Sequence, residues 1–346
     1  MNKILSFVIP AYNAAQFLDK CILSLVNEEV FDKLDIIIVN DGSTDNTMEA
    51  AQKYCDKYPG TIKMINQENK GHGGALNTGC AAAAGKYLKV IDADDWVETQ
   101  NLPDFVRLLK ECESDVVLTH HYTINISTDE VKKWKSYPRE FGRAYSFDEI
   151  MLNWKSFDRS LTFHGITYNT EFYHKNAIQL SEHVFYEDHE FAAIPCCYAR
   201  SITPFDLFIY DYRIGDVRQS VSDENQLRKI SNTEAVLKRF MKEYKTIKLD
   251  ENSVGGRAYY CRKAQGLLLS YITTVMLVEK KRKRGRELGD QMMARFQRDM
   301  PMTFVMAKKQ YQIFRLMNKF HISKNTWEMI LSSKAYKMIQ KKHDFD

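Results

Sequence analysis

The chain has 346 residues, of which 44% are hydrophobic and 27% are charged, with a net charge of +4. These values exclude a disordered chain and allow one large globular domain or two. The longest late apolar run, 266–278, has 13 residues and is too short to cross a bilayer, and the N-terminus lacks a signal-peptide pattern. We therefore expect a soluble, cytoplasmic protein.

The net charge conceals an asymmetry along the chain. Residues 251–346 contain 20 Lys and Arg against 8 Asp and Glu, whereas the first 250 residues contain 29 against 37. An acidic N-terminal part and a basic C-terminal part suggest two regions with different partners. The seven cysteines are scattered without metal-ligand spacing, which favours reduced thiols in the cytosol.

In the first 120 residues, segments with the sequence pattern of a strand alternate with segments that have the pattern of a helix. Strands are predicted at 4–10, 34–40, 61–66, 86–92 and 115–120, and helices at 14–27, 43–58, 74–84 and 101–112. The strand at 34–40 is almost uniformly apolar, as in a parallel sheet covered on both faces. Ser43 or Thr44 is the expected N-cap of the second helix. This alternation predicts a doubly wound α/β layer.

The pattern changes after residue 120. It weakens over 121–165, where we expect insertions, and short helices and strands follow over 170–213. From about residue 223 onward the pattern is helical. We find no internal repeat and no low-complexity tract.

Polar and glycine residues follow each of the first four strands. These are Pro10-Ala11-Tyr12-Asn13, then Asn40-Asp41-Gly42-Ser43, then Asn69-Lys70-Gly71-His72-Gly73-Gly74, and finally Asp92-Ala93-Asp94-Asp95. The carboxyl ends of parallel strands meet at one edge of a sheet, where ligands bind. Three carboxylates within four positions repel one another, so a metal, a basic side chain or water must offset them.

The residue types at this edge suit a nucleotide diphosphate. Tyr12 could stack on a base, and Asp41 could accept from a base N–H or a ribose hydroxyl. A helix start at Gly71 could offer backbone N–H groups to phosphate. Asp92 and Asp94 could hold Mg²⁺ or Mn²⁺, which prefer oxygen ligands and often share them with phosphates.

Each of these pieces has a plainer interpretation when taken alone. Pro10-Ala11-Tyr12 is then only a strand end, Asp41-Gly42 an ordinary turn, and the three carboxylates of 92–95 a solvated helix cap. The glycine run also has some features of a dinucleotide fingerprint, since an acid, Asp92, lies about 20 residues on. However, Leu76 occupies the position of the third glycine and the run follows the third strand, which disfavours a dehydrogenase.

The ordered set resembles a known family. "SFVIPAYN", "IIIVNDGSTDNT" and "NKGHGGALNTGCAAAAGKYLKVIDADD" together resemble the donor-nucleotide half of glycosyltransferase family 2, whose members are inverting GT-A enzymes that use nucleotide sugars. The resemblance is dense over 4–97 and resumes at 163–191 and 210–222. It implies an α/β GT-A fold, a Rossmann-like, doubly wound and mostly parallel sheet, followed by a helical C-terminal region.

The resemblance also implies domain limits and site residues. The catalytic domain would span 1–222, with a nucleotide-sugar half at 1–120 and an acceptor half at 121–222, and the basic helical region would span 223–346. The implied nucleotide-sugar contacts are Pro10, Ala11, Tyr12, Asn13, Asp41, Asn69, Lys70, Gly71, Asp92, Ala93, Asp94, Arg218 and Ser220. Asp94 would be the principal ligand of Mn²⁺ or Mg²⁺, with Asp92 near the ribose or the metal, and Asp95 would cap the next helix.

The acid pair in "FYEDHEF" matches the family's catalytic signature. Asp188 would be the base, with Glu187 as the fallback, although an acid pair at a helix N-terminus is also favourable by itself. His164, where many relatives have Trp, could face the acceptor or be structural. One departure is Leu76, where relatives have Arg, so Lys70 or His72 could compensate in holding the donor.

The implied function is the transfer of a sugar from UDP-hexose or UDP-N-acetylhexosamine to a hydroxyl of a surface or capsular glycan. The alternative is a catalytically silent sugar-nucleotide-binding subunit. A nucleotidyltransferase is disfavoured because no lysine-containing glycine loop follows the first strand.

The C-terminal region carries a basic run, 280–286. Its positive residues are Lys280, Lys281, Arg282, Lys283, Arg284 and Arg286. The run could be a solvated face, could rest on an anionic leaflet at the inner side of the membrane, or could contact an anionic or lipid-linked acceptor. Nucleic acid is not expected, since no nucleic-acid-binding pattern is present.

Overall fold

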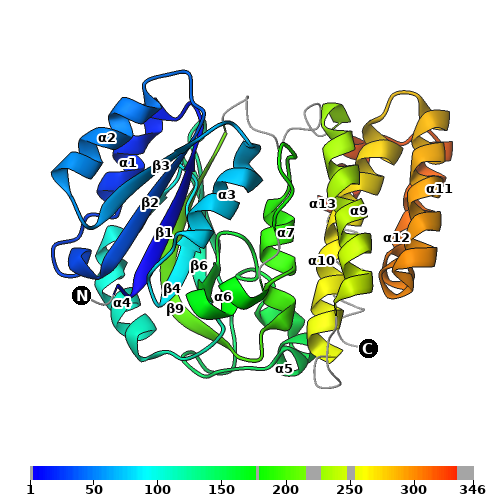
Figure 1. Cartoon of the computed structure of the whole chain (residues 1–346). Helices are drawn as coiled ribbons and strands as arrows, with labels where there is room; N and C mark the ends of the chain where they lie inside the picture. The colour runs from blue at the N-terminus through cyan, green and yellow to red at the C-terminus, as the bar shows by residue number, and fades with distance from the viewer. Residues whose placement is uncertain (1–2, 177–178, 216–226, 248–253, 333–346) are drawn as a thin grey trace. The chain divides into compact units, whose positions relative to one another are not determined.

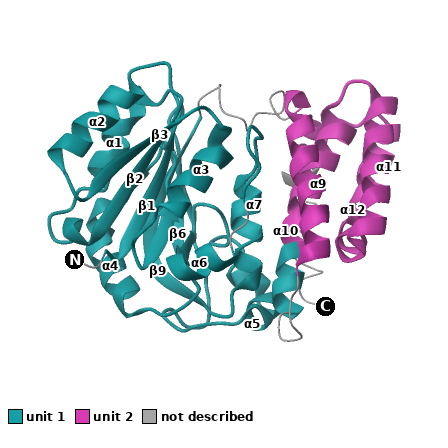
Figure 2. Cartoon of the chain, in the orientation of Figure 1, with its two compact units in different colours: residues 1–219, 248–260 teal, residues 220–247, 261–346 magenta. Residues whose placement is uncertain are grey.

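The computed structural model describes residues 3–176, 179–215, 227–247 and 254–332 (Figure 1). The chain forms two compact units, which Figure 2 shows in different colours. The first comprises residues 1–219 and 248–260, and the second comprises residues 220–247 and 261–346. The predicted limits at residues 120 and 222 stay predictions.

The first unit is built on one mixed β-sheet. Its strands are β1 (Leu5–Ala11), β2 (Leu34–Asp41), β3 (Ile62–Gln67), β4 (Tyr87–Val90), β5 (Trp96–Val97), β6 (Val116–Asn125), β7 (Glu130–Trp134), β8 (Ile166–Asn169) and β9 (Ile202–Ile214). Its described helices are α1 (Ala15–Ser24), α2 (Thr47–Lys57), α3 (Gly71–Ala81), α4 (Leu102–Glu111), α5 (Phe147–Leu152), α6 (Thr170–Asn176) and α7 (Asp188–Ala193). The strand order is β3-β2-β1-β4-β8-β6-β9-β5, with β7 paired to β6.

The strands β1 to β4 form the parallel part of the sheet. β1 pairs in parallel with β2 and β4, and β2 pairs in parallel with β3. β8 then enters antiparallel to both β4 and β6, while β9 runs parallel to β6. The predicted doubly wound, mostly parallel arrangement is confirmed, and the antiparallel insertion of β8 is a feature that the local pattern did not reveal.

Both faces of β1, β2 and β4 are buried because these strands are largely apolar on both sides, whereas β3 at the edge of the sheet is mostly half-buried. Phe7 and Ile36 belong to one buried cluster with residues of α1, α2 and α4. On the other face α3 approaches closely, since a Cβ atom on Gly79 would lie 2.3 Å from Cγ1 of Val8. The two helical layers thereby fix β1 and β2, whose carboxyl ends carry Tyr12 and Asp41.

Two local expectations were wrong. The second helix begins at Thr47, because Ser43 and Thr44 belong to a loop that binds Asn13 instead of capping a helix. The backbone N–H of Asn13 donates to Ser43 Oγ (3.1 Å), and that of Thr44 donates to Asn13 Oδ1 (2.8 Å). Asp95 does not cap a helix either, because its carboxylate is bound to β9.

The second unit is helical, as predicted. Its described helices are α9 (Ile230–Thr246), α10 (Val254–Thr273, in this unit from Cys261), α11 (Arg282–Asp299), α12 (Pro301–Lys319) and α13 (Lys324–Ser332). A π-helical turn, Thr274–Val278, follows α10. Among the helices described, none is both long and apolar enough to span a membrane.

Candidate active site

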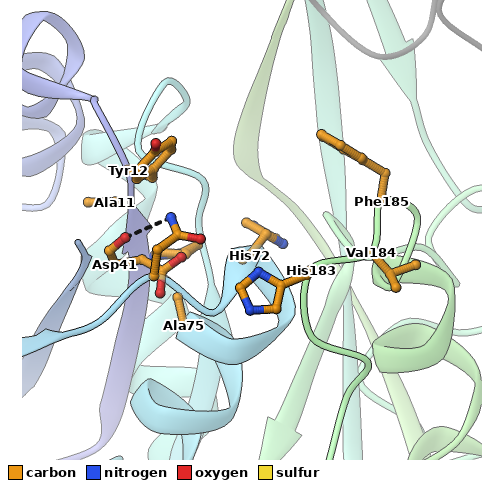
Figure 3. Close-up of a pocket in the computed structure, with 11 residues that line it drawn as sticks. Ala11, Tyr12, Asp41, His72, Ala75, His183, Val184 and Phe185 are labelled. Atoms are coloured by element: carbon orange, nitrogen blue, oxygen red, sulfur yellow. Dashed lines mark hydrogen bonds between the residues drawn. The ribbon is translucent and has the colours of Figure 1, made fainter. Parts of the chain in front are cut away.

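A cavity of about 360 Å³ lies at the carboxyl ends of β1 and β2 (Figure 3). Ligand pockets usually enclose roughly 300–1,000 Å³. Its lining comprises Pro10, Ala11, Tyr12, Asp41, Asn69, Gly71, His72, Ala75, His183, Val184 and Phe185. The structure therefore brings six of the predicted nucleotide-sugar residues around one space, and segment 183–185 forms the opposite wall.

Asp41 is held firmly at the end of β2 but keeps one oxygen without a partner. Its Oδ1 accepts from the backbone N–H of Lys70 (2.9 Å) and from Nε2 of Gln67 (2.6 Å). Its backbone oxygen accepts from Asn69 Nδ2 at 2.9 Å, the bond drawn in Figure 3. Oδ2 is buried and makes no hydrogen bond within the described chain. A buried carboxylate oxygen is unfavourable unless a donor reaches it, so this atom points to a ligand N–H or O–H.

The glycines at the start of α3 have a packing role that the sequence did not reveal. Gly71 has φ of +76°, and a Cβ atom there would lie 2.8 Å from the backbone nitrogen of His183. A Cβ atom on Gly73 would lie 2.2 Å from the carbonyl oxygen of Ser181. Only glycine allows such an approach. These positions therefore seat segment 180–185, which forms one wall of the cavity.

His72 links two carboxylates that lie far apart in the sequence. Its Nε2 is 2.8 Å from Asp92 Oδ1, and its Nδ1 is 2.5 Å from Glu187 Oε1. Burial disfavours a charged ring, but the two carboxylates outweigh it and raise the pKa of His72 well above its ordinary value. The ring is therefore a cation that donates to both acids.

The other two acids of the cluster have different environments. Asp95 is buried and accepts from the hydroxyl of Tyr210 (2.5 Å) and the backbone N–H of Arg213 (2.7 Å), which anchors the 92–95 turn to β9. Asp94 lies 3.6 Å from the Arg213 guanidinium. Burial, together with the negative charge of Asp92, raises the pKa of Asp94 to about 6.

Glu187 and Asp188 differ in their availability. Glu187 is 4% exposed and is bound to His72, whereas Asp188 is half-buried at the first position of α7. The carboxylate of Asp188 makes no hydrogen bond to a described residue. Of the two predicted candidates for the base, Asp188 thus has the carboxylate that a substrate can reach, and its catalytic role stays a prediction.

His164 belongs to an aromatic group beside the acids. Its ring stacks on Tyr212, with centroids 4.2 Å apart, and lies 5.2 Å from the ring of His121. Burial lowers the pKa of His164 well below its ordinary value, so the ring is neutral. Its carbonyl oxygen accepts from the buried Lys89 ammonium at 2.6 Å. His164 and Tyr212 are both partly exposed and so can offer ring surface to a ligand.

Two of the acids are suited to hold a divalent metal ion together with substrate phosphates. No group of three or more His, Cys, Asp or Glu residues with metal-site geometry occurs in the described part of the chain. Mg²⁺ is commonly held by one or two carboxylates plus substrate phosphates. Asp92 and Asp94 supply hard oxygen donors of this kind, so the donor set fits such an ion. Arg218 and Ser220 lie outside the described residues.

Comparison with known proteins places this site in a family. Residues 6–173 match the model of a family described as Glycosyl transferase family 2. Residues 6–173 are a glycosyltransferase family 2 domain. The domain includes the predicted donor residues up to Asp94 and ends before Glu187 and Asp188.

One curated relative of this domain is chondroitin synthase from Escherichia coli. It is 35% identical over 145 residues, which are 40% of this chain and 20% of that protein. The first four curated relatives are matched over only 17% to 42% of their own lengths.

Two solved structures share the fold of this chain, which is the GT-A fold. S. aureus TarS 1–349 in complex with UDP-GlcNAc superposes with a TM-score of 0.64 and 18% identity, covering 93% of this chain and 89% of that one. The mannosyltransferase PcManGT from Pyrobaculum calidifontis in complex with GDP-Man and Mn²⁺ superposes with a TM-score of 0.52 and 16% identity. The match covers 93% of this chain and 86% of that one. At these identities the likeness is one of fold alone.

Proposed function

We propose that the protein is an inverting glycosyltransferase. It would move a hexose or N-acetylhexosamine from a UDP-sugar to a hydroxyl of a glycan in the biosynthesis of a surface or capsular polysaccharide. The observation that carries this proposal is the unpartnered Oδ2 of Asp41, which lies in a cavity that also contains Tyr12 and His72. The similarity to a polysaccharide synthase, named chondroitin synthase, supports the acceptor class.

The donor nucleotide occupies the cavity in this proposal. Tyr12 is 53% exposed and offers a ring face for a base, while Asp41 Oδ2 accepts from the base or the ribose. Asn69 and Lys70 act through Asp41, since their amide groups orient it. UDP-GlcNAc in the TarS complex supports a UDP-sugar as the donor.

The diphosphate extends from the cavity toward the acids. Asp94, with Asp92, would hold Mn²⁺ or Mg²⁺, which would offset the charge that develops on the departing diphosphate. His72 keeps Asp92 in place through its hydrogen bond. The proposed contacts of Asn13, Ala93, Arg218 and Ser220 with the donor rest on the family resemblance.

Asp188 removes the proton from the acceptor hydroxyl as that oxygen attacks the anomeric carbon. Attack opposite the leaving diphosphate inverts the anomeric configuration. A positioned base typically contributes 10²–10⁴-fold to the rate. Glu187 does not compete for this role, because His72 holds it as a buried ion-pair partner.

The acceptor lies against His164 and Tyr212. Stacked rings next to the acids provide the flat apolar surface on which a sugar face can rest, and the rings are partly exposed. A lipid-linked or anionic glycan is the proposed acceptor. The protein would then act in the cytoplasm, at the inner face of the membrane, with the 280–286 run near the surface.

The first test is isothermal titration calorimetry with a panel of nucleotide sugars. We expect one donor to bind with Mn²⁺ or Mg²⁺, to weaken with EDTA, and to be lost in Asp94→Ala, while Asp104→Ala on the exposed face of α4 leaves binding unchanged. Asp188→Asn should bind that donor normally but lose at least 10²-fold in turnover.

The outcomes separate the alternatives. If no donor binds with metal present, the donor site is wrong. If the wild type binds a donor but no glycan acceptor supports turnover, the protein is a silent sugar-nucleotide-binding subunit.

A further inference from the structure

Helix α12 in the second unit exposes a row of large apolar side chains. It buries a narrow face that includes Phe314 and Met317. The exposed apolar stripe, as we name it, comprises Met302 (44% exposed), Val305 (69%), Ile313 (39%), Leu316 (56%) and Phe320 (67%). At roughly 100° of rotation per residue, these five positions fall within about 80° of arc. A row of exposed large apolar side chains along one arc of a helix is typical of a binding surface.

The charges on the same helix are all positive. α12 contains Lys308, Lys309, Arg315 and Lys319, all exposed, and residues 301–319 contain no Asp or Glu. Lys309 lies within the exposed apolar stripe, and the other three lie on the neighbouring arc of the helix. Arg315 also pairs with Asp290 of α11 at 3.0 Å. An apolar strip bordered by Lys and Arg is the pattern of helices that lie in a membrane interface.

The basic run at 280–286 adjoins the C-terminal end of this helix. Arg286 donates to Asn318 Oδ1 at 2.6 Å, which places the start of α11 beside the end of α12. Arg282 donates to the carbonyl oxygen of Met276 at 2.9 Å, and Arg284 lies 3.5 Å from Glu279. These three arginines therefore stabilise the unit.

The lysines of the run have a different position. Lys280, Lys281 and Lys283 are exposed, and Lys283 lies 4.0 Å from Glu287 of its own helix. They can therefore face an anionic surface together with Lys319. The sequence left open whether the six positive residues of the run are a solvated face or meet an anionic leaflet or acceptor, and the arginine contacts make the lysines the better candidates for such a surface.

We propose that α12 lies in the interface of an anionic membrane, with the exposed apolar stripe among the acyl chains and the lysines at the headgroups. A second copy is a poorer occupant, because a helix with four cations and no anion would meet the same charges. A soluble anionic polymer would match the lysines but would leave the apolar stripe in water. This proposal concerns the second unit alone and does not depend on the donor site.

The test is cosedimentation of the full chain with vesicles. We expect binding to vesicles of phosphatidylglycerol and phosphatidylcholine, weak binding to phosphatidylcholine alone, and a decrease with salt, because exposed charges are screened. Each basic residue near an anionic surface contributes about fivefold in partition. Lys308→Glu with Lys319→Glu should therefore weaken binding at least 20-fold.

The apolar contribution needs its own variant. Leu316→Gln with Phe320→Gln should weaken binding at least tenfold, because two large side chains no longer leave water. Matched controls are Leu152→Gln on α5, where Leu152 is 85% exposed, and Lys53→Glu with Lys57→Glu on α2. These controls carry the same pair of charge reversals and the same Leu→Gln change elsewhere, and they should bind as the wild type does.

Three results would overturn the proposal. One is unchanged vesicle binding in the Leu316/Phe320 variant with a wild-type melting curve. Another is a wild-type dimer in ultracentrifugation that the Leu316/Phe320 variant no longer forms, together with no vesicle binding by either protein. That result would assign the stripe to a second copy. The third is binding to soluble polyphosphate, but not to vesicles, that needs the lysines and not the apolar stripe.

Discussion

Replacement of Lys89 by methionine should stabilise the protein and change how its stability depends on pH. Lys89 in β4 is fully buried, and its ammonium donates to the carbonyl oxygens of His164 (2.6 Å) and Ile166 (3.3 Å). Burial lowers the pKa of Lys89 to about 7. The charged form is therefore less stable in the folded protein than in the unfolded chain.

The sign and the size of the effect follow from this pKa. An unfolded lysine has a pKa near 10.4, so between about pH 7 and pH 10 the unfolded chain binds more protons and the free energy of unfolding rises with pH. The full penalty, present below about pH 7, is on the order of 5 kcal/mol. Methionine removes it but leaves two carbonyl oxygens without a donor, at about 1–3 kcal/mol. By difference, the net gain at pH 7 is about 2–4 kcal/mol.

Urea unfolding of both proteins between about pH 6 and pH 11 measures this difference. As the pH rises from about 7 to 10, the free energy of unfolding of the wild type should increase relative to that of Lys89→Met. Lys86→Met is the control for the loss of one positive charge. If both proteins show the same pH slope, or if the variant is less stable at every pH, the burial argument is refuted. The variant should also show a higher acceptor KM, because Lys89 positions His164.

Three further predictions concern the site and its support. His72→Gln should destabilise the fold by about 2 kcal/mol in urea unfolding and lower kcat, because the buried Glu187 carboxylate loses its cation; an unchanged stability would contradict the bridge. Asp41→Asn should weaken donor binding at least tenfold in calorimetry while the melting temperature changes little, and equal affinity would exclude Asp41 Oδ2 as an acceptor. Gly79→Ala should lower stability by about 1–3 kcal/mol in calorimetric melting, since its Cβ would overlap Val8, and a neutral result would mean that α3 can shift.

The parts of the fold that could be predicted are those encoded locally. β1, β2 and the residues that follow them could be predicted because apolar strands there end in polar turns. The sheet then brings the ends of these strands together. Pro10, Tyr12 and Asp41 accordingly line one cavity. The antiparallel strand β8 was not predicted, because its four residues, 166–169, carry little periodicity by themselves.

The contacts that could not be predicted join residues far apart in the chain. The partners His72 and Glu187 are 115 positions apart, as are Asp95 and Tyr210. Local pattern assigns such residues to a turn or a helix start, and only the folded chain shows that they bind each other. The sequence offered only indirect evidence for a role of His72. Relatives have Arg at the position of Leu76, so another positive residue near the same helix was expected to replace that charge.

Asp94 should contribute more than Asp92 to cation-dependent donor binding. Asp95 is satisfied by two hydrogen bonds from β9, and Asp92 is bound to the charged His72 ring. Asp94 has a more distant partner, at 3.6 Å, and burial together with Asp92 raises its pKa to about 6. A cation at this position therefore relieves the least satisfied of the three acids.

Calorimetric titration of the donor with Mn²⁺ and with EDTA checks this ranking in two isosteric variants. Asp94→Asn should abolish the difference between the two conditions, whereas Asp92→Asn should reduce it and also lower stability, because His72 loses one acceptor. The reverse ranking would mean that the His72 bridge opens when the donor binds. Asp92 would then be the principal ligand, and His72 would close the site only in the absence of donor.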